Sequence, residues 1–417
     1  MRLPILLRSG WQQVNIGDIA HWAGALALLY RELCSRDEEV RFQPFAPLGN
    51  AGKLLQRWPR VILDSADAES HSLSAGFMIH GSGGTINLDA VRSWRGKPWG
   101  AYGVTYTGGP YGSSFADALP AETVDLLNTA EFIFTRETGT AAFLRSQGVS
   151  GPPVQFGPDA TFGFDSTDEA GADQVLKTLG MPPTGSTAGS TAGSPGGAAF
   201  LAVIPKLRID PYWRMGLTDM SQSEIAAAER INTSCVAGDH HILREIIAWW
   251  VRRTGSPVLL CPEMTYQLDL MDRWIISLLP RDVAPQVHPL PFFWLPDLAS
   301  SVYRRAAAVV SVEMHSPILA LNVGTPAIHL RQKEDSPKGQ MWRDIGLERW
   351  LVDMDWQNDN DRQAVAAATI GALEDILANP EDAAWTVQTA GKRVRNAEDE
   401  AWQIIRDRVA GSTQENP

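Results

Sequence analysis

The sequence of 417 residues has only three cysteines, Cys34, Cys235 and Cys261, and they lie far apart. An odd number without paired spacing argues against a disulfide framework and a cysteine-based zinc site, and indicates a reducing compartment. Long apolar runs are also missing. No stretch approaches the roughly 20 residues of a membrane-spanning helix, and the N-terminal apolar run is too short for a signal peptide. We therefore expect a cytoplasmic protein without an integral membrane segment.

The sequence has fewer basic than acidic residues. The chain has 36 Lys and Arg residues against 48 Asp and Glu, which gives a net charge of −12. A basic excess supplies most of the affinity for nucleic acid and for anionic membranes, so neither is expected as a partner. An anionic ligand must instead find a local basic site. The length, with 44% hydrophobic and 20% charged residues, is sufficient for two or three domains with real cores.

Strand-like and helix-like segments alternate along the chain. Short β-branched and aromatic runs, such as Ile5–Leu7 and Phe132–Thr135, are separated by segments with helical periodicity, such as Ala121–Asn128. This alternation predicts a parallel, doubly wound sheet in the N-terminal half and a second α/β region after it.

A low-complexity segment separates the two regions. Residues 181–197 are rich in glycine, serine and threonine, and the tetrapeptide T-A-G-S occurs twice. Such a segment buries too little apolar surface to order itself, so we expect a flexible linker. The expected domains are residues 1–180 and 198–380, followed by a C-terminal helix and tail over residues 381–417.

The stretch from Val309 to Lys333 reads as strand, loop, helix and strand, which is a βαβ unit. Ser316 followed by Pro317 is typical of a helix N-cap and first helical position. Free N–H groups and the helix dipole favour an anion at such a point, so His315 is expected beside a phosphate site. A structural histidine that bonds loop carbonyls is the other interpretation.

Two loops in the N-terminal half also follow expected strands. The loop before Asp18 leads into a helix expected from Ile19 to Cys34, with Asp18 as its N-cap. Residues 81–84, G-S-G-G, come directly after the expected strand at 76–80. Glycines there allow either a close approach of backbone to ligand or simply a tight turn.

Several motifs carry a resemblance to a known family. The N-terminal half contains N-I-G-D at 15–18, G-S-G-G at 81–84, G-K-P-W-G-A-Y-G-V at 96–104, F-T-R-E at 134–137 and P-D-A-T-F at 158–162. The second half contains S-V-E-M-H-S at 311–316 and G-T-P at 324–326. In order and spacing, and over most of the chain, these motifs resemble the polysaccharide pyruvyl transferase family.

The resemblance implies two Rossmann-like domains that face each other across a cleft, in a glycosyltransferase-B-like arrangement. It also implies transfer of a pyruvyl group from phosphoenolpyruvate to a sugar of a cell-surface or exopolysaccharide precursor, as a cyclic ketal with loss of phosphate. The expected partners are phosphoenolpyruvate and a saccharide or lipid-linked saccharide, and the chemistry requires no metal or nucleotide cofactor. One departure is Glu313, which stands where the family has an arginine and would repel the donor's anionic groups.

The reaction needs an acid for the methylene carbon, cations for phosphate and carboxylate, and a base for the sugar hydroxyl. His315 is the expected acid, Asp18 and Asp159 are the candidate bases, and Arg331 or Arg208 is expected to neutralise Glu313. The remaining expected substrate-binding residues are Asn15, Gly17, Gly83, Gly84, Arg136, Ser316 and Lys333, with Lys338 as a further cation.

Two other functions remain open at this point. The first is a glycosyltransferase with a nucleotide-sugar donor, in which the carboxylate of Glu313 accepts hydrogen bonds from hydroxyl groups. The second is a saccharide-binding homologue that has lost its donor and its catalysis.

Overall fold

The computed structural model describes residues 4–35, 37–65, 74–94, 96–108, 114–181 and 200–412. The chain forms two compact units. Unit 1 comprises Met1–Asp165, Ser336–Ile345 and Lys392–Pro417, and unit 2 comprises Ser166–Asp335 and Gly346–Gly391. These divisions differ from the expected boundaries near residues 180 and 380, whose status as folding domains stays a prediction. The expected linker lies outside the described residues, apart from Met181.

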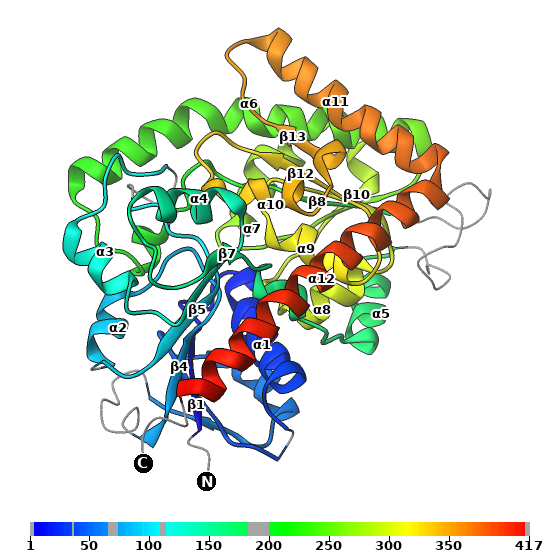
Figure 1. The fold of residues 1–417 in the computed structure, drawn as a ribbon. Coiled ribbons are helices and arrows are strands. Elements are labelled where there is room, and N and C mark those ends of the chain that lie inside the picture. Colours follow the sequence, from blue (N-terminus) through cyan, green and yellow to red (C-terminus); the bar gives the residue numbers. More distant parts are fainter. Residues whose placement is uncertain are drawn as a thin grey trace. The chain divides into compact units, whose positions relative to one another are not determined.

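Unit 1 is built on a parallel sheet of seven strands in the order β3-β2-β1-β4-β5-β6-β7 (Figure 1). The strand order reverses direction between β1 and β4, and ligands of open α/β sheets bind beyond the carboxyl ends of the strands at such a switch point. The strands are β1 (Ile5–Ser9), β2 (Val40–Pro44), β3 (Val61–Leu63), β4 (Phe77–His80), β5 (Trp99–Val104), β6 (Phe132–Thr135) and β7 (Val154–Phe156).

Alternate residues of the unit 1 strands face opposite sides of the sheet. Tyr102 packs against Trp402 of the C-terminal helix with tilted rings, whereas its neighbour Ala101 belongs to the core cluster that also contains Val91 and Leu127. The helices are α1 (Ile16–Glu32), α2 (Leu88–Ser93), α3 (Ala121–Leu127), α4 (Thr138–Ser146), α10 (Gln340–Asp344) and the part of α12 (Pro380–Ser412) from Lys392 onward, with short 3-10 segments η1 (Gly49–Arg57), η4 (Ala160–Gly163) and η8 (Pro337–Gly339).

Unit 2 repeats the plan with a parallel six-stranded sheet in the order β10-β9-β8-β11-β12-β13. Its switch point lies between β8 and β11. The strands are β8 (Phe200–Ile204), β9 (Val258–Leu260), β10 (Val287–Pro289), β11 (Ala306–Ser311), β12 (Ala327–Arg331) and β13 (Leu351–Asp353).

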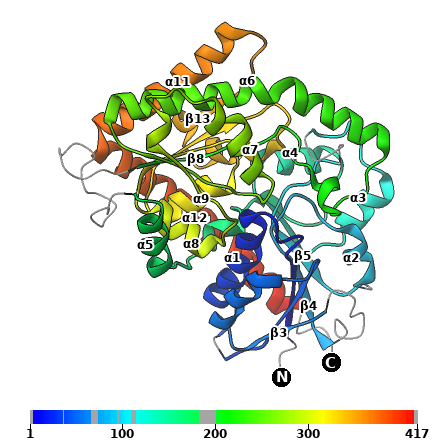
Figure 2. The ribbon, with the colours of Figure 1, turned by 180° about the vertical axis from the view of Figure 1, so that it is seen from behind.

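Two long helices of unit 2, α6 and α11, lie side by side, and α8 and α9 pack on each other and on β11 (Figures 1 and 2). The helices are α5 (Glu169–Thr178), α6 (Gln222–Thr254), α7 (Gln267–Trp274), α8 (Pro296–Tyr303), α9 (His315–Asn322), α11 (Asp359–Ala378) and the start of α12, with 3-10 segments η5 (Tyr212–Met215), η6 (Ile276–Leu278), η7 (Ala284–Gln286) and η9 (Glu348–Trp350).

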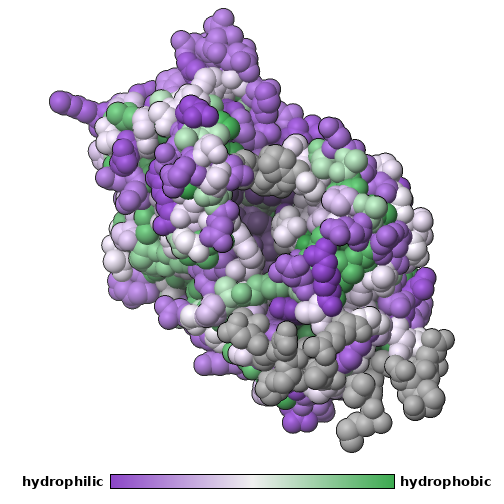
Figure 3. Space-filling view, turned by 90° about the vertical axis from the view of Figure 1, so that its left-hand side faces the viewer, coloured by the Kyte–Doolittle hydropathy of each residue, from purple (hydrophilic) through white to green (hydrophobic). Residues whose placement is uncertain are grey.

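On the face shown in Figure 3, hydrophobic residues occur in separate patches among hydrophilic ones. Among the described helices, none combines the length and the apolar character that crossing a bilayer requires. Cys34, Cys235 and Cys261 form no disulfides.

Candidate functional site

In unit 2 the polar residues of interest lie where β8, β9 and β11 end. Helix α9 begins at His315 itself, and its N-cap position is occupied by Met314, which makes no capping hydrogen bond through its side chain. The expectation that Ser316 caps the helix is therefore wrong, because Ser316 lies inside the first turn. Its hydroxyl accepts a hydrogen bond from the Tyr303 hydroxyl at 3.1 Å.

A carboxylate of the protein supplies the missing cap. Glu263 follows β9 and is fully buried, and one of its oxygens accepts the backbone N–H of Ser316 at 2.6 Å. Its other oxygen lies 3.0 Å from Nδ1 of His315. The anion that a helix N-terminus favours is thus already present as a side chain.

Charge and hydrogen bonding both act on Glu263. Burial alone would raise the pKa of Glu263, but the hydrogen bond and charge of His315, with the hydrogen bonds from Ser316, outweigh it and lower the pKa from its ordinary value. Glu263 is therefore an ionised carboxylate that fixes the ring orientation of His315.

Glu313 lies between the end of β11 and His315 and is only 1% exposed. Its Oε1 accepts a hydrogen bond from Nε2 of Gln267 at 2.8 Å. The Gln267 side-chain oxygen in turn accepts the backbone N–H groups of Glu263 and Met264 at 2.7 and 3.0 Å. Gln267 therefore holds the Glu313 carboxylate and the loop that carries Glu263 in one hydrogen-bonded network.

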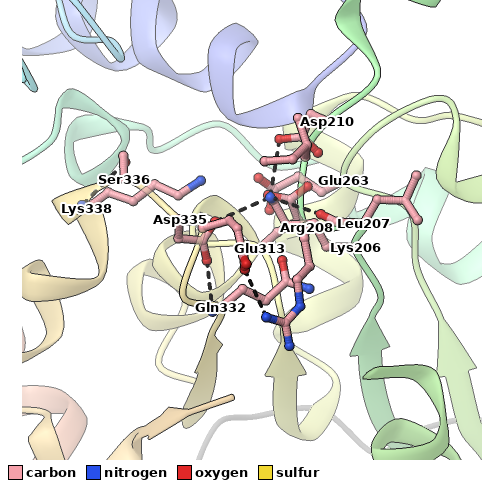
Figure 4. Close-up of polar contacts among 12 residues, drawn as sticks. Lys206, Leu207, Arg208, Asp210, Glu263, Glu313, Gln332, Asp335, Ser336 and Lys338 are labelled. Atoms are coloured by element: carbon pink, nitrogen blue, oxygen red, sulfur yellow. Dashed lines mark hydrogen bonds and ion pairs between the residues drawn. The ribbon is translucent and has the colours of Figure 1, made fainter. Parts of the chain in front are cut away.

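Lys206, just after β8, is the buried cation of this region (Figure 4). Its Nζ lies 3.4 Å from Asp210 and 3.3 Å from Asp335. Burial alone would lower the pKa of Lys206, but the charges of Asp210, Asp335 and Glu313 raise it above its ordinary value. One ammonium group therefore faces three carboxylates, and the surroundings of Lys206 favour cationic or hydroxyl-bearing groups over a further anion.

The arginines expected to neutralise Glu313 form ion pairs with other residues. Arg208 binds Asp239 through Nε at 2.9 Å and Glu334 at 3.0 Å, and its guanidinium lies 5.5 Å from the ring centre of Trp356. Arg331 pairs with Asp353 on the neighbouring strand at 2.6 Å, and Lys333 is exposed in the following turn. The charge of Glu313 is among those that act on Lys206.

In unit 1, helix α1 begins earlier than expected, at Ile16. Asn15 is its N-cap and accepts the backbone N–H of Gly17 at 2.6 Å. The expected capping role of Asp18 is therefore wrong, since Asp18 lies in the first helical turn. Its carboxylate is bonded by the Gln12 side chain and lies 3.6 Å from Nδ1 of His21.

His21 lies between two carboxylates. Its Nε2 is 3.2 Å from Oδ2 of Asp159, a fully buried residue that caps η4 by accepting the N–H of Thr161 at 2.8 Å. Arg136, at the end of β6, donates to the same Oδ2 at 2.9 Å and to Thr105 at 2.7 Å. Asp159 thus has partners on both oxygens, which suits it to position His21 and Arg136 rather than to accept a proton.

The glycine-rich loop after β4 has two different parts. At Gly81 a Cβ atom would lie 2.7 Å from Cβ of Ser9, so the tight approach of the chain to β1 requires glycine there. At Gly83 and Gly84 a Cβ would have no neighbour within 4 Å. Gly83 bonds the backbone at Gly103 and Thr105, so it continues the sheet edge while leaving open space beside it.

Four residues of these networks were not among the expected site residues: His21, Glu263, Gln267 and Lys206. His21 had a usable signal, because it stands three residues after Asp18 and therefore on the same helical face. Lys206 followed an expected strand at its carboxyl end. Glu263 follows β9 in the same way, whereas Gln267 begins helix α7 and carries no such signal.

Comparisons with known proteins agree with this architecture. The model of the polysaccharide pyruvyl transferase family matches residues 15–334. The search of curated proteins returned no match.

Similar solved structures are a UDP-GlcNAc 2-epimerase from Neisseria meningitidis bound to UDP-GlcNAc (TM-score 0.53, 10% identity, covering 97% of this chain and 100% of that chain) and the Escherichia coli ADP-heptose heptosyltransferase II (0.50, 10%, 91% and 100%). A third is the Staphylococcus aureus MnaA structure with UDP (0.50, 11%, 97% and 98%). Identities this low show the fold alone.

The expected class of fold, two Rossmann-like α/β domains as in such glycosyltransferases and epimerases, is confirmed. The resemblance read from the motifs is confirmed as well, because the family match spans most of the chain. The protein belongs to the polysaccharide pyruvyl transferase family and is assigned as a transferase.

Proposed function

We propose that the protein transfers a pyruvyl group from phosphoenolpyruvate to a sugar of a cell-surface or exopolysaccharide precursor, in the cytoplasm, as a cyclic ketal. The observation that carries this proposal is the pair of His315 and Glu263 within the family-matched region, with 3.0 Å between Nδ1 and the carboxylate. A buried carboxylate that fixes a histidine by one nitrogen leaves the other nitrogen oriented for proton transfer.

The chemistry balances without a metal or a nucleotide cofactor. Nε2 of His315 gives a proton to the methylene carbon of phosphoenolpyruvate, which becomes the methyl group of the product. A sugar hydroxyl then bonds to the adjacent carbon and loses its proton to a base. A second sugar hydroxyl displaces the phosphate at that carbon, so the C–O bond to phosphate breaks and inorganic phosphate leaves with the second proton.

We assign acceptor binding to unit 1, where Asp18 and His21 are the candidate bases. Asp18 is the more accessible of the two carboxylates beside His21, with 13% of its side chain exposed against none for Asp159. Asp159 and Arg136 act as positioning residues. Asn15 and Gly17 shape the start of α1 through backbone and capping contacts.

A nucleotide-sugar glycosyltransferase is the second candidate, and Glu313 is the observation that favours it. Its carboxylate, with Asp210 and Asp335 around Lys206, makes a poor site for a trianionic donor and a good acceptor of hydroxyl hydrogen bonds. The similar epimerase from Neisseria meningitidis is bound to such a nucleotide sugar.

Calorimetric titration of the wild type and of Glu313→Arg with phosphoenolpyruvate and with UDP-GlcNAc separates the candidates. The substitution changes the local balance from one cation against three carboxylates to two against two. Under pyruvyl transfer it tightens phosphoenolpyruvate binding by about tenfold, the scale of one charge-assisted hydrogen bond.

Nucleotide-sugar binding by the wild type that is lost in Glu313→Arg, without any phosphoenolpyruvate response, would refute pyruvyl transfer. Binding of neither donor would leave the saccharide-binding homologue as the explanation. Glu348→Arg, a change of the same charge on an exposed residue of unit 2, controls for net charge.

A further inference from the structure

Arg8 is the feature of unit 1 that the networks described above do not use. It lies in β1 one residue before the strand ends, beside the switch point between β1 and β4. Its Nε is buried without a hydrogen-bond partner, and within the described part of the chain it forms no ion pair. Burial lowers the pKa of Arg8 from its ordinary value.

The neighbours of Arg8 are neutral. In the parallel register Arg8 lies opposite His80 of β4 and Gln43 of β2, so the three side chains share one face of the sheet. His80 accepts the backbone N–H of Asn87 at Nε2 and donates from Nδ1 to the carbonyl of Gly81. Burial lowers the pKa of His80 to about 4, and the charge of Arg8 acts in the same direction.

An aromatic ring holds the guanidinium in place. The Cζ atom of Arg8 lies 4.9 Å from the centre of the Phe45 ring, and that ring lies 5.6 Å from the ring of His80. Stacking orients an arginine without neutralising it, so the N–H groups of the planar guanidinium keep their capacity to bind two oxygens of a carboxylate or phosphate.

The glycine-rich loop Gly81–Gly84 begins beside the backbone of Arg8. The backbone N–H of Gly81 donates to the carbonyl of Arg8 at 2.8 Å, which joins the glycine-rich loop directly to β1. Two residues further on, Gly83 and Gly84 border open space. Trp11, in the loop after β1, is 41% exposed, and an exposed indole can stack on a sugar ring.

Several other buried or half-buried cations differ from Arg8, because each has a carboxylate partner. Arg41 in the neighbouring strand binds both oxygens of Asp64 at 2.7 and 3.0 Å, and Arg136 and Lys206 each lie beside a buried carboxylate. Removing a guanidinium from water without a counter-charge is costly, and a bound anion removes that cost.

We propose that Arg8 and the loop Gly81–Gly84 form a binding site for an oxyanion, a phosphate or carboxylate group carried by a saccharide substrate. The acceptor is thus an anionic saccharide, and its charged group is held at the carboxyl end of β1. The assignment of that ligand as the acceptor rests on the proposed function, whereas the oxyanion site itself does not.

The test titrates the full-length protein with inorganic phosphate by calorimetry at constant ionic strength. Arg8→Gln should weaken phosphate binding by about 10- to 100-fold, and Arg8→Lys by less, because a lysine keeps the charge but loses the bidentate geometry. Arg92→Gln is the matched control: Arg92 lies in the same unit, is exposed, and pairs with Asp89 one turn away at 2.8 Å. It should bind phosphate like the wild type.

The site is refuted if phosphate binds Arg8→Gln as tightly as the wild type, or if no binding is found in any of the proteins. It is also refuted if Arg8→Gln lowers the melting temperature of the ligand-free protein as much as Arg41→Gln does, since Arg8 would then serve folding. Circular dichroism of each variant separates weak binding from unfolding.

Three further titrations identify the source of the oxyanion. Binding of a hexose 1-phosphate that depends on Arg8 supports a phosphorylated acceptor, and Arg8-dependent binding of a hexuronate supports a carboxylated one. Arg8-dependent binding of phosphoenolpyruvate alone overturns the acceptor assignment and moves the donor to unit 1. Because these are binding measurements, a failure of pyruvyl transfer in an activity assay leaves them intact.

Discussion

The switch points of the two sheets are alike in topology and opposite in charge. In unit 1 the central strand β1 carries Arg8, whose neighbours Gln43 and His80 are neutral. In unit 2 the corresponding central strand β8 leads to Lys206, which is surrounded by Asp210, Asp335 and Glu313. Arg8 therefore has no counter-charge among these neighbours, whereas the three carboxylates around Lys206 exceed its charge by two.

The difference extends to the helix that starts at each edge. In unit 2 the N-terminus of α9 is occupied by the carboxylate of Glu263, so its anion site is filled from within. In unit 1 the N-terminus of α1 is capped by a neutral amide, that of Asn15. The same fold therefore offers an anion site in one unit and a site for hydroxyls or cations in the other, and the side chains at the strand ends decide which.

The largest effect is expected from the histidine of unit 2. His315→Gln removes the proposed acid and should lower the rate of phosphate release from phosphoenolpyruvate, with acceptor present, by about 10²- to 10⁴-fold. His288→Gln, at a partly exposed histidine of β10 in the same unit, should leave the rate within about twofold of the wild type. Equal rates for the two variants would remove His315 from the chemistry.

The contrast in charge balance predicts a large loss of stability at Lys206 and almost none at Arg8. Lys206→Met leaves buried carboxylates without their cation and should reduce the free energy of unfolding by about 3–5 kcal/mol. Arg8→Gln removes a cation that has no counter-charge and should change it by less than about 1 kcal/mol. Urea denaturation of both variants measures the two changes in the free energy of unfolding. Similar changes in the two variants would contradict the difference in charge balance between the two units.

The stability of the protein should depend on pH through Glu137 of unit 1. Burial raises the pKa of this carboxyl to about 7 from 4.5, although Arg136 and the hydroxyls of Thr140 and Thr105 act against the shift. The folded state therefore holds a proton that the unfolded state has lost, so stability present below about pH 4.5 declines as the pH rises to about 7. The full decline is roughly 3 kcal/mol.

Glu137→Gln tests this assignment, because it keeps a neutral side chain at every pH. Its free energy of unfolding should lack the decline between about pH 5 and 7 that the wild type shows. The same slope in both proteins would place the titrating group elsewhere.

The smallest effect is expected in the glycine-rich loop. Gly83→Ala adds a methyl group to open space and should change the free energy of unfolding by less than about 0.5 kcal/mol. Gly24→Ala is the opposite case, since its Cβ would lie 1.9 Å from the carbonyl oxygen of Ala160 and should cost about 3 kcal/mol or more.

For function, Gly83→Val should weaken saccharide binding more than it weakens folding, because a larger side chain fills the open space beside the loop. Calorimetric titration with the acceptor measures the saccharide affinity, and thermal unfolding measures the stability of the variant. Equal losses would make the loop a structural element only.

Much of the fold is readable from local patterns. The apolar run at β6 and the βαβ unit around His315 match the expected segments, because buried parallel strands require continuous apolar residues. Strand β2, V-R-F-Q-P, was not expected, because its polar residues Arg41 and Gln43 interrupt the apolar run that would indicate a buried strand. The first half of α6 was also not expected, because its polar surface shows no clear apolar stripe before Ile242.

The helices at the two candidate sites begin three residues (α1) and two residues (α9) earlier than expected, because several residues that can cap a helix stand close together. Asn15 and Asp18 are both good N-caps by type, and only the chain direction set by β1 selects Asn15. At α9 the N–H of Ser316 donates to the carboxylate of Glu263, 53 residues earlier in the chain. No local sequence pattern could indicate this hydrogen bond.

The sequence by itself determined the class of fold, the family and the identity of His315 and Glu313 as residues of interest, since these follow from periodicity and from motifs in a fixed order. Only the tertiary structure decided which charged residues form ion pairs with each other. Ion pairs such as those of Lys206 with Asp335, Arg208 with Asp239 and Asp159 with Arg136 join different strand ends, loops and helices of the fold. Coulomb energies depend on distances of a few ångströms, and those distances exist only after the sheets have formed.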